Sequence, residues 1–159
     1  MTFIIRPMRD GEADSIADMV RGLADHIGTG IVPKLTGDIL RQSRDLVDVV
    51  VADRDGHLLG ACLGLLTFST WRGARGLYVV DLFVDPGERG RNVGLELLRE
   101  SARRASRRGA SFIKLEVDED NTGAERFYAR LGFHKKTDDR LHILEQDDLQ
   151  TLIATGATP

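Results

Sequence analysis

Residues 79–98, in the middle of the chain, constrain the fold more than any other part of the sequence. The stretch begins with an apolar run over 79–84 that only Asp81 interrupts, and a glycine-bearing loop follows. From Val93 onward, apolar residues recur at helical spacing, with Leu97 and Leu98 on the same face. An apolar run of this kind is typical of a central, buried strand. The stretch therefore predicts a strand, a glycine loop and a helix in direct succession.

The N-terminus of this predicted helix is a candidate phosphate-binding site. Unpaired backbone N–H groups and the positive end of the helix dipole favour an anion there. Small residues at Gly90 and Gly94 allow close approach to the backbone, and Arg89 and Arg91 add forked cationic donors. The loop has neither the Walker pattern GxxxxGK[ST] nor the dinucleotide pattern GxGxxG. A tight strand-to-helix turn with solvated arginines is the alternative interpretation.

The remaining hydrophobic pattern predicts an α/β fold. Apolar residues with strand periodicity occupy 3–7, 46–52, 57–68, 77–84, 111–117, 133 onward and 141–144. Helical periodicity covers 10–27, 36–44, 93–108, 121–131 and a last segment from 147 to about 154, with Asp10 as the expected N-cap of the first helix. Hairpins alternate with two helical crossovers, so we expect a mixed sheet with helices on both faces. A length of 159 residues suits one domain over 1–159.

Composition excludes several classes of protein. A net charge of −3 argues against a surface built to bind nucleic acid or an anionic membrane. The longest nearly apolar stretch, 58–68, is too short to span a bilayer, and the N-terminus shows no export signal. Cys62 is the single cysteine, so there is no disulfide framework, and its apolar strand favours a core role over a nucleophilic one. We expect a cytoplasmic protein without a metal site.

Two motifs resemble those of a known family. Residues 89–94, Arg-Gly-Arg-Asn-Val-Gly, look like the acetyl-CoA pyrophosphate motif R/Q-x-x-G-x-G/A of the GNAT superfamily of N-acetyltransferases. Residues 121–133 look like its second motif, N-x-x-A-x-x-F-Y-x-x-x-G-F, in the right order and spacing. Asn92 stands where the family's middle glycine usually lies, but asparagine tolerates left-handed backbone, so we expect the turn to survive.

The resemblance implies a fold, a cosubstrate and a set of site residues. The implied GNAT fold has a mixed, mostly antiparallel sheet of six to seven strands, about four helices and a splayed pair of parallel strands. Acetyl-CoA is the implied acetyl donor, with Tyr128 as the acid that protonates the departing thiolate. A phenol with a pKa near 10 suits that task, although a packing role for Tyr128 is the alternative. The residues implied to bind the cosubstrate are Leu82, Phe83, Val84, Arg89, Gly90, Arg91, Asn92, Val93, Gly94, Leu95, Asn121, Ala124 and Tyr128.

The general base is open between two carboxylates. Asp81 interrupts an apolar strand beside the implied cosubstrate arm, and burial there would raise the pKa of its carboxyl group. Glu116, on the strand after the phosphate-loop helix, is the other candidate. Either carboxylate could instead anchor a charged substrate or accept structural hydrogen bonds. Strand alternation does not decide between these roles, because bulges reset the face. His26 is a further candidate on the substrate side.

Within the superfamily, residues 68–71 and 77–84 look most like the diamine (spermidine/spermine) acetyltransferase branch. Val80 and Ile27 stand where that branch carries acidic residues, which weakens the case for a polycationic acceptor. The hypothesis is an N-acetyltransferase that acts on a primary amine of a small molecule: a diamine, a polyamine or an amino-acid-like compound. The alternatives are a non-catalytic acyl-CoA-binding or sensor domain, and a protein N-terminal or lysine acetyltransferase. The resemblance also favours a homodimer.

Overall fold

The structure, a computed structural model, describes residues 2–28 and 30–154. It separates into two units, the first ending at Asn121 and the second beginning at Thr122. The strands, all in the first unit, are β1 (Ile4–Pro7), β2 (Asp48–Arg54), β3 (His57–Ser69), β4 (Ala74–Val84) and β5 (Ala110–Leu115). The α-helices are α1 (Ala13–Ile27), α2 (Gly37–Gln42), α3 (Val93–Arg107), α4 (Thr122–Arg130) and α5 (Gln146–Ala154).

The sheet is mixed, as the sequence predicts. Its order is β1-β2-β3-β4-β5, and every neighbouring pair is antiparallel except β4 and β5, which are parallel. The β2–β3 hairpin closes through Asp55 and Gly56, both with left-handed backbone (φ 52° and 84°), as expected of this turn sequence. Helix α3 provides the crossover that parallel strands require.

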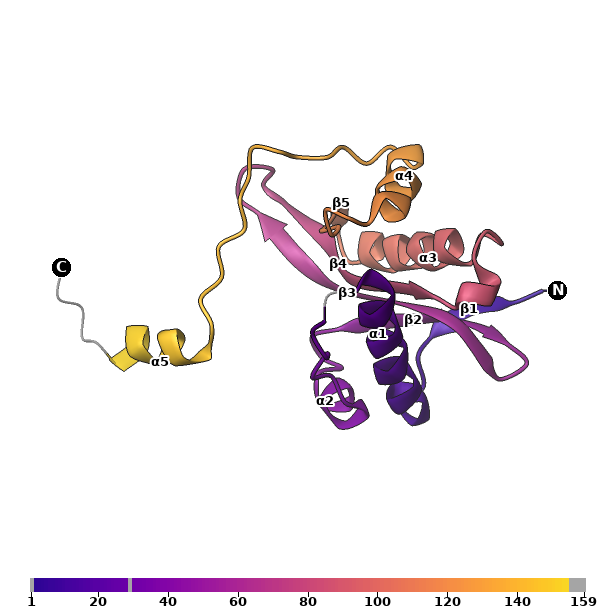
Figure 1. Cartoon of the computed structure of the whole chain (residues 1–159). Coiled ribbons are helices and arrows are strands. Elements are labelled where there is room, and N and C mark those ends of the chain that lie inside the picture. The colour runs from indigo at the N-terminus through magenta and orange to yellow at the C-terminus, as the bar shows by residue number, and fades with distance from the viewer. Residues whose placement is uncertain (1, 29, 155–159) are drawn as a thin grey trace. The chain divides into compact units, whose positions relative to one another are not determined.

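Helices cover both faces of the sheet (Figure 1). Side chains of β2 and β3 alternate between the two faces. On one face, Val49 and Leu63 pack in a buried cluster with Ile16 of α1 and Leu40 of α2. On the other face lies α3, which contacts β2, β3, β4 and β5. We call these the α1 face and the α3 face, because the distinction decides which side chains can meet at the site.

The prediction of six to seven strands is wrong for the part of the chain that the structure describes. Residues 133–145, expected to contribute two strands, form neither strands nor helices. Alternating apolar residues make a strand only where a neighbour takes up the backbone hydrogen bonds, and the described sheet ends at β5. Leu141, Ile143 and Leu144 are accordingly exposed.

Asp10 is not the N-cap of α1. It opens a 3-10 turn over Asp10–Glu12, and α1 begins at Ala13. The Asp10 carboxylate accepts a hydrogen bond from Arg44 Nη1 at 2.8 Å instead of from a helix amide. The Glu12 carboxylate takes the local amide, accepting from Arg9 N at 2.8 Å. The helix therefore begins after this turn, at Ala13, and not directly after Asp10 as the sequence predicts.

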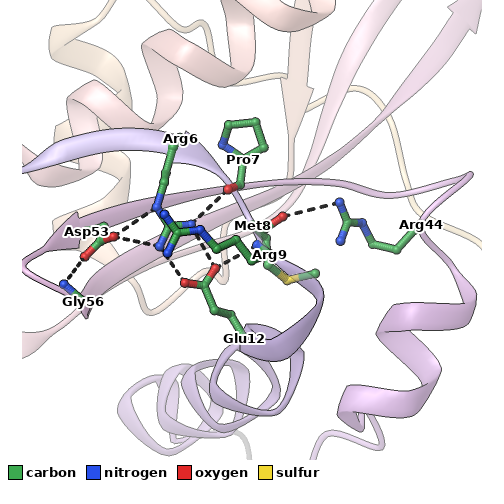
Figure 2. A network of polar contacts seen from close by, with 8 residues as sticks. All are labelled: Arg6, Pro7, Met8, Arg9, Glu12, Arg44, Asp53 and Gly56. Atoms are coloured by element: carbon green, nitrogen blue, oxygen red, sulfur yellow. Dashed lines mark hydrogen bonds and ion pairs between the residues drawn. The ribbon is translucent and has the colours of Figure 1, made fainter.

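An ionic network fastens β1 to the turn before α1 and to the β2–β3 hairpin (Figure 2). Arg6 donates to Asp53 Oδ2 through Nε (3.0 Å) and Nη2 (2.7 Å), and to Glu12 Oε2 through Nη1 (2.9 Å). The Asp53 carboxylate also accepts from Gly56 N at 2.8 Å. All three charged side chains are largely buried. The hydrogen bonds from Arg6 lower the pKa of both carboxyl groups.

We expect Arg6→Met to lower the free energy of unfolding at pH 7 by about 3 kcal/mol, since it leaves two largely buried carboxylates without their partner. The pKa values of both carboxyl groups are lower in the folded protein than in the unfolded chain, where they are near 4. The network therefore stabilises the folded state fully above those unfolded-state pKa values, and this stabilisation is lost as the pH falls through the folded-state pKa values. The difference between wild type and variant should therefore shrink on acidification. Urea unfolding between pH 3 and pH 7 measures it. Arg99→Met, which breaks an exposed ion pair with Glu96, is the control and should lower the free energy of unfolding by less than about 1 kcal/mol. An equal decrease in the two variants would contradict the stabilising role of the network.

Candidate active site

A bulge in β4 decides which side chains share a face. Leu63 of β3 pairs with Asp81, but the next residue, Gly64, pairs with Val79, so Val80 is an extra residue without a partner on β3. Val80 is 46% exposed, whereas Val79 is buried. Side chains that strict alternation would separate, those of Tyr78 and Asp81, are therefore both placed on the α1 face.

Tyr78, Asp81 and Glu116 form a polar cluster at the carboxyl end of β4 and β5. Tyr78 pairs in register with Lys114 of β5, and Glu116 lies two residues further along, on the same face. Burial, the charge of Glu116 and a hydrogen bond to it, and the charge of Asp81 raise the pKa of the Tyr78 hydroxyl. Burial alone raises the pKa of the Asp81 carboxyl group. The structure thus brings together both candidate bases and adds a tyrosine to them.

The two parallel strands separate beside this cluster. Pairing between β4 and β5 ends at Val79 and Leu115, while β4 continues to Val84 with β3 as its described partner. The β5-side edge of residues 82–84 therefore has no strand partner in the described part of the chain, and Val84 O accepts a hydrogen bond from Arg89 Nε at 3.3 Å. The ring of Phe83 packs toward Gly22 of α1, where an added Cβ would lie 3.5 Å from the ring. This contact sets α1 against the open part of β4.

The loop after β4 has the geometry that an anion site at a helix N-terminus requires. Gly90 and Asn92 adopt left-handed backbone (φ 77° and 65°), so asparagine does support the turn at the position expected to carry glycine. The first backbone bond of α3 runs from Glu96 N to Asn92 O at 3.0 Å. The amides of Val93, Gly94 and Leu95 precede it and have no acceptor within the helix.

Side chains around the loop hold it in place. Glu88 makes two hydrogen bonds of 2.9 Å with Arg54 of the β2–β3 hairpin. Arg89 donates from Nε to Val84 O at 3.3 Å, and its Nη1 lies 3.3 Å from His26 Nε2 at the end of α1. Arg91 is exposed beside Glu88. His26 therefore contacts the phosphate loop in this structure, while its role toward the acceptor stays a prediction.

Tyr128 lies in the second unit. It is on α4 between two aromatic rings, with centroid distances of 5.1 Å to Phe127 and 5.3 Å to Phe133, both edge to face. Ala124 is on the same helix, and Asn121, whose amide donates to Asp118 O at 2.9 Å, precedes it. The ring packing keeps the Tyr128 side chain in a defined orientation on its helix.

Sequence reasoning missed Tyr78 and Lys114 as members of the site. The Lys114 ammonium lies over the Tyr78 ring, 5.2 Å from its centroid. The alternation of Phe112, Lys114 and Glu116 over 112–116 could have indicated that Lys114 shares a face with Glu116. That Tyr78 lies on the same face as Asp81 depends on the bulge and could not be predicted. Cys62 is buried, and burial raises the pKa of its thiol to about 11, which suits a core residue.

Two absences hold for residues 2–28 and 30–154. In these ranges no group of three or more His, Cys, Asp or Glu side chains is arranged to hold a metal ion. Over the same part of the chain, no helix combines the length and apolar character needed to cross a membrane.

Comparison with known proteins identifies relatives of this chain. The family model described as "Acetyltransferase (GNAT) family" matches residues 23–133, more than half of the chain. Thialysine N-epsilon-acetyltransferase of Sus scrofa is 29% identical over 147 residues, covering 85% of this chain and 86% of the relative. Streptothricin acetyltransferase of Streptomyces lavendulae is 37% identical over 84 residues, covering 53% and 42%. An integron cassette protein from the mobile metagenome of V. cholerae superimposes with a TM-score of 0.78 at 18% identity, over 98% of this chain and 99% of that one.

Proposed function

The chain belongs to the acetyltransferase (GNAT) family, and from this premise we propose that it moves an acetyl group from acetyl-CoA to a primary amine of a small molecule. Enzymes of this family use acetyl-CoA as cosubstrate, so acyl transfer to an amine follows from membership. The observation that carries the finer proposal is the cluster of Tyr78, Asp81 and Glu116 beside the open end of β4. Its carboxylates suit an ammonium group that must lose a proton before it reacts.

Acetyl-CoA is proposed to bind across the end of β4 and the N-terminus of α3. The free amides of 93–95, the left-handed turn at Gly90 and the exposed Arg91 together suit a pyrophosphate. An added Cβ at Gly90 would meet no atom within 4 Å, so there is open space at the turn. The backbone of Leu82, Phe83 and Val84, in the part of β4 that has no β5 partner, is proposed to bind the amide groups of the pantetheine arm. Asn121 and Ala124 are proposed to contribute to the same arm.

The proposed reaction is direct attack of the neutral amine on the thioester carbonyl. A nitrogen–carbon bond forms, the carbon–sulfur bond breaks, and the amine proton passes to a base while the thiolate takes up a proton from an acid. Asp81 is the proposed base, because burial raises the pKa of its carboxyl group and so makes its carboxylate more basic. Glu116 is then left to hold the ammonium form, and Tyr128 is the proposed acid.

Three further properties belong to this proposal. We propose that residues 1–159 form a single N-acetyltransferase domain, that the enzyme works in the cytoplasm, and that it is a homodimer. The relatives whose names specify thialysine support an acceptor of low molecular weight. They also agree with a place near the diamine branch, whose pattern the middle of the chain resembles.

We expect a small primary amine with at most two positive charges to be preferred to spermine. Val80 and Ile27 stand at two positions where the diamine branch carries acidic residues, so a bound polycation would lack two carboxylate partners. Each ammonium group left unpaired costs about 1 to 3 kcal/mol, or about 5 to 150-fold in kcat/KM. A panel of putrescine, lysine, spermidine and spermine, followed by CoA release, measures the preference.

The same panel tests the function itself. Spermine showing the highest kcat/KM of the four would overturn the expected preference. Acetyl-CoA binding without turnover on any amine would favour a non-catalytic acyl-CoA-binding domain, and turnover confined to peptide N-termini or peptide lysines would favour a protein acetyltransferase.

A further inference from the structure

The α1 face of β4 and β5 changes from positive to negative charge along the strands. Phe112 and Lys114 alternate along β5, and Glu116 directly follows its last residue, so continued alternation places all three side chains on this face. Phe112 pairs in register with Gly76 of β4, and Lys114 pairs with Tyr78. The strands therefore carry a cation before they separate and carboxylates where they separate.

Aromatic rings hold the positive half of this surface in place. The Arg72 guanidinium carbon lies 4.8 Å from the centroid of the Phe112 ring, and the Lys114 ammonium lies 5.2 Å from that of Tyr78. The Phe112 ring crosses Gly76, where an added Cβ would come within 2.3 Å of it. Neither Arg72 nor Lys114 forms an ion pair with another residue in the ranges the structure describes. Both cations are thus oriented and available to an anion.

The negative part of this surface, Glu116 and Asp81, lies next to Lys114 where the two strands separate. Glu116 follows Lys114 by two residues, which separates their Cα atoms by about 6.6 Å at the usual rise of ~3.3 Å per residue. Glu116 hydrogen-bonds the Tyr78 hydroxyl, and the Asp81 charge acts on the same hydroxyl. A molecule that crosses Tyr78 would therefore meet a cation at one end of its path and carboxylates at the other.

We propose that the acceptor is zwitterionic: a primary amine and a carboxylate joined by several bonds, with the carboxylate bound by Lys114 and the reacting amine held by Glu116 and Asp81. This inference rests on the proposed acetyl transfer and names the substrate class of the same site. A diamine would bring its second ammonium group toward Lys114 and lose affinity through like-charge repulsion. Arg72, further along the same face, supports a longer anionic group in the same direction.

Lysine and cadaverine test the proposal, because they present the same terminal amine on the same chain and differ by one carboxylate. We expect wild-type kcat/KM to be at least 10-fold higher for lysine. Lys114→Gln should lower kcat/KM for lysine by about 10-fold, chiefly through KM, and should raise that for cadaverine, because it removes the charge that repels the second ammonium group. Lys114→Glu should reverse the preference, since it replaces the anion-binding group by a repelling one.

The control is Arg107→Gln, which removes one positive charge from α3, on the other face of the sheet, and should leave the lysine to cadaverine ratio unchanged. A wild-type ratio near one, or equal losses for both amines in Lys114→Gln, would overturn the zwitterion proposal while turnover itself continued. Loss of all amine acetylation in the wild-type enzyme would instead overturn the proposed function. Lys114 is exposed, so we expect the variants to keep the wild-type Tm, which thermal unfolding checks.

Discussion

Gly94→Glu is expected to abolish acetyl-CoA binding while leaving the protein folded. Gly94 is in the first turn of α3, among the amides that have no acceptor within the helix. A glutamate there places a bulky side chain and a negative charge where the pyrophosphate is proposed to bind, so steric exclusion and charge repulsion act together. We expect the Kd for acetyl-CoA to rise by more than 100-fold, as measured by isothermal titration calorimetry.

Gly11→Glu is the matched control for this change. Gly11 lies in the 3-10 turn before α1, and an added Cβ there would meet no atom within 4 Å. Gly11→Glu introduces the same side chain and charge at the start of another helical segment, away from the N-terminus of α3. We therefore expect it to leave the Kd for acetyl-CoA within 2-fold of the wild-type value. Unchanged affinity in a folded Gly94→Glu protein would falsify the proposed site.

Tyr128→Phe is expected to lower kcat by about 10 to 1,000-fold with a smaller change in acetyl-CoA affinity. The substitution removes one hydroxyl and keeps the ring that packs between Phe127 and Phe133. A general acid acts mainly in the transition state, so its loss lowers kcat more than it changes ground-state binding. Single-turnover kinetics at saturating substrates isolates the chemical step.

Tyr78→Phe provides the comparison, because Tyr78 and Tyr128 are the two tyrosines of the chain. Loss of the Tyr78 hydroxyl removes its hydrogen bond with Glu116, so we expect this variant to raise KM for the amine more than it lowers kcat. A Tyr128→Phe enzyme with wild-type kcat in a chemistry-limited assay would leave Tyr128 with a packing role. A large rise in KM with unchanged kcat would assign it to binding.

Much of the phosphate loop could be predicted from local sequence. The apolar run, the glycines and the helical period at Val93 are properties of neighbouring residues, and each reports on local backbone geometry. The left-handed backbone at Asn92 followed from a preference of asparagine itself. The hairpin at 53–56 was readable for the same reason. Such features need no knowledge of what packs against them.

The mutual placement of the site residues could not be read in this way. Asp81 and Glu116 were recognisable as carboxylates in apolar strands, but their shared face depends on the unpaired Val80, and a bulge exists only relative to the neighbouring strand. Lys114 became part of the site because its ammonium lies over a ring on the adjacent strand. Both facts are pairings between residues distant in sequence.

The sequence by itself determined the order of elements through β5, the turn at the start of α3 and the chemical types available for acyl transfer. These follow from side-chain periodicity and backbone preference, which act over a few residues. The tertiary structure alone decided the register of β4 against β3, the meeting of Tyr78 with Glu116, and the absence of a strand at 133–145 within the described sheet. Strand pairing requires hydrogen-bond partners from elsewhere in the chain, so an apolar alternation identifies a segment able to pair and does not identify its partner.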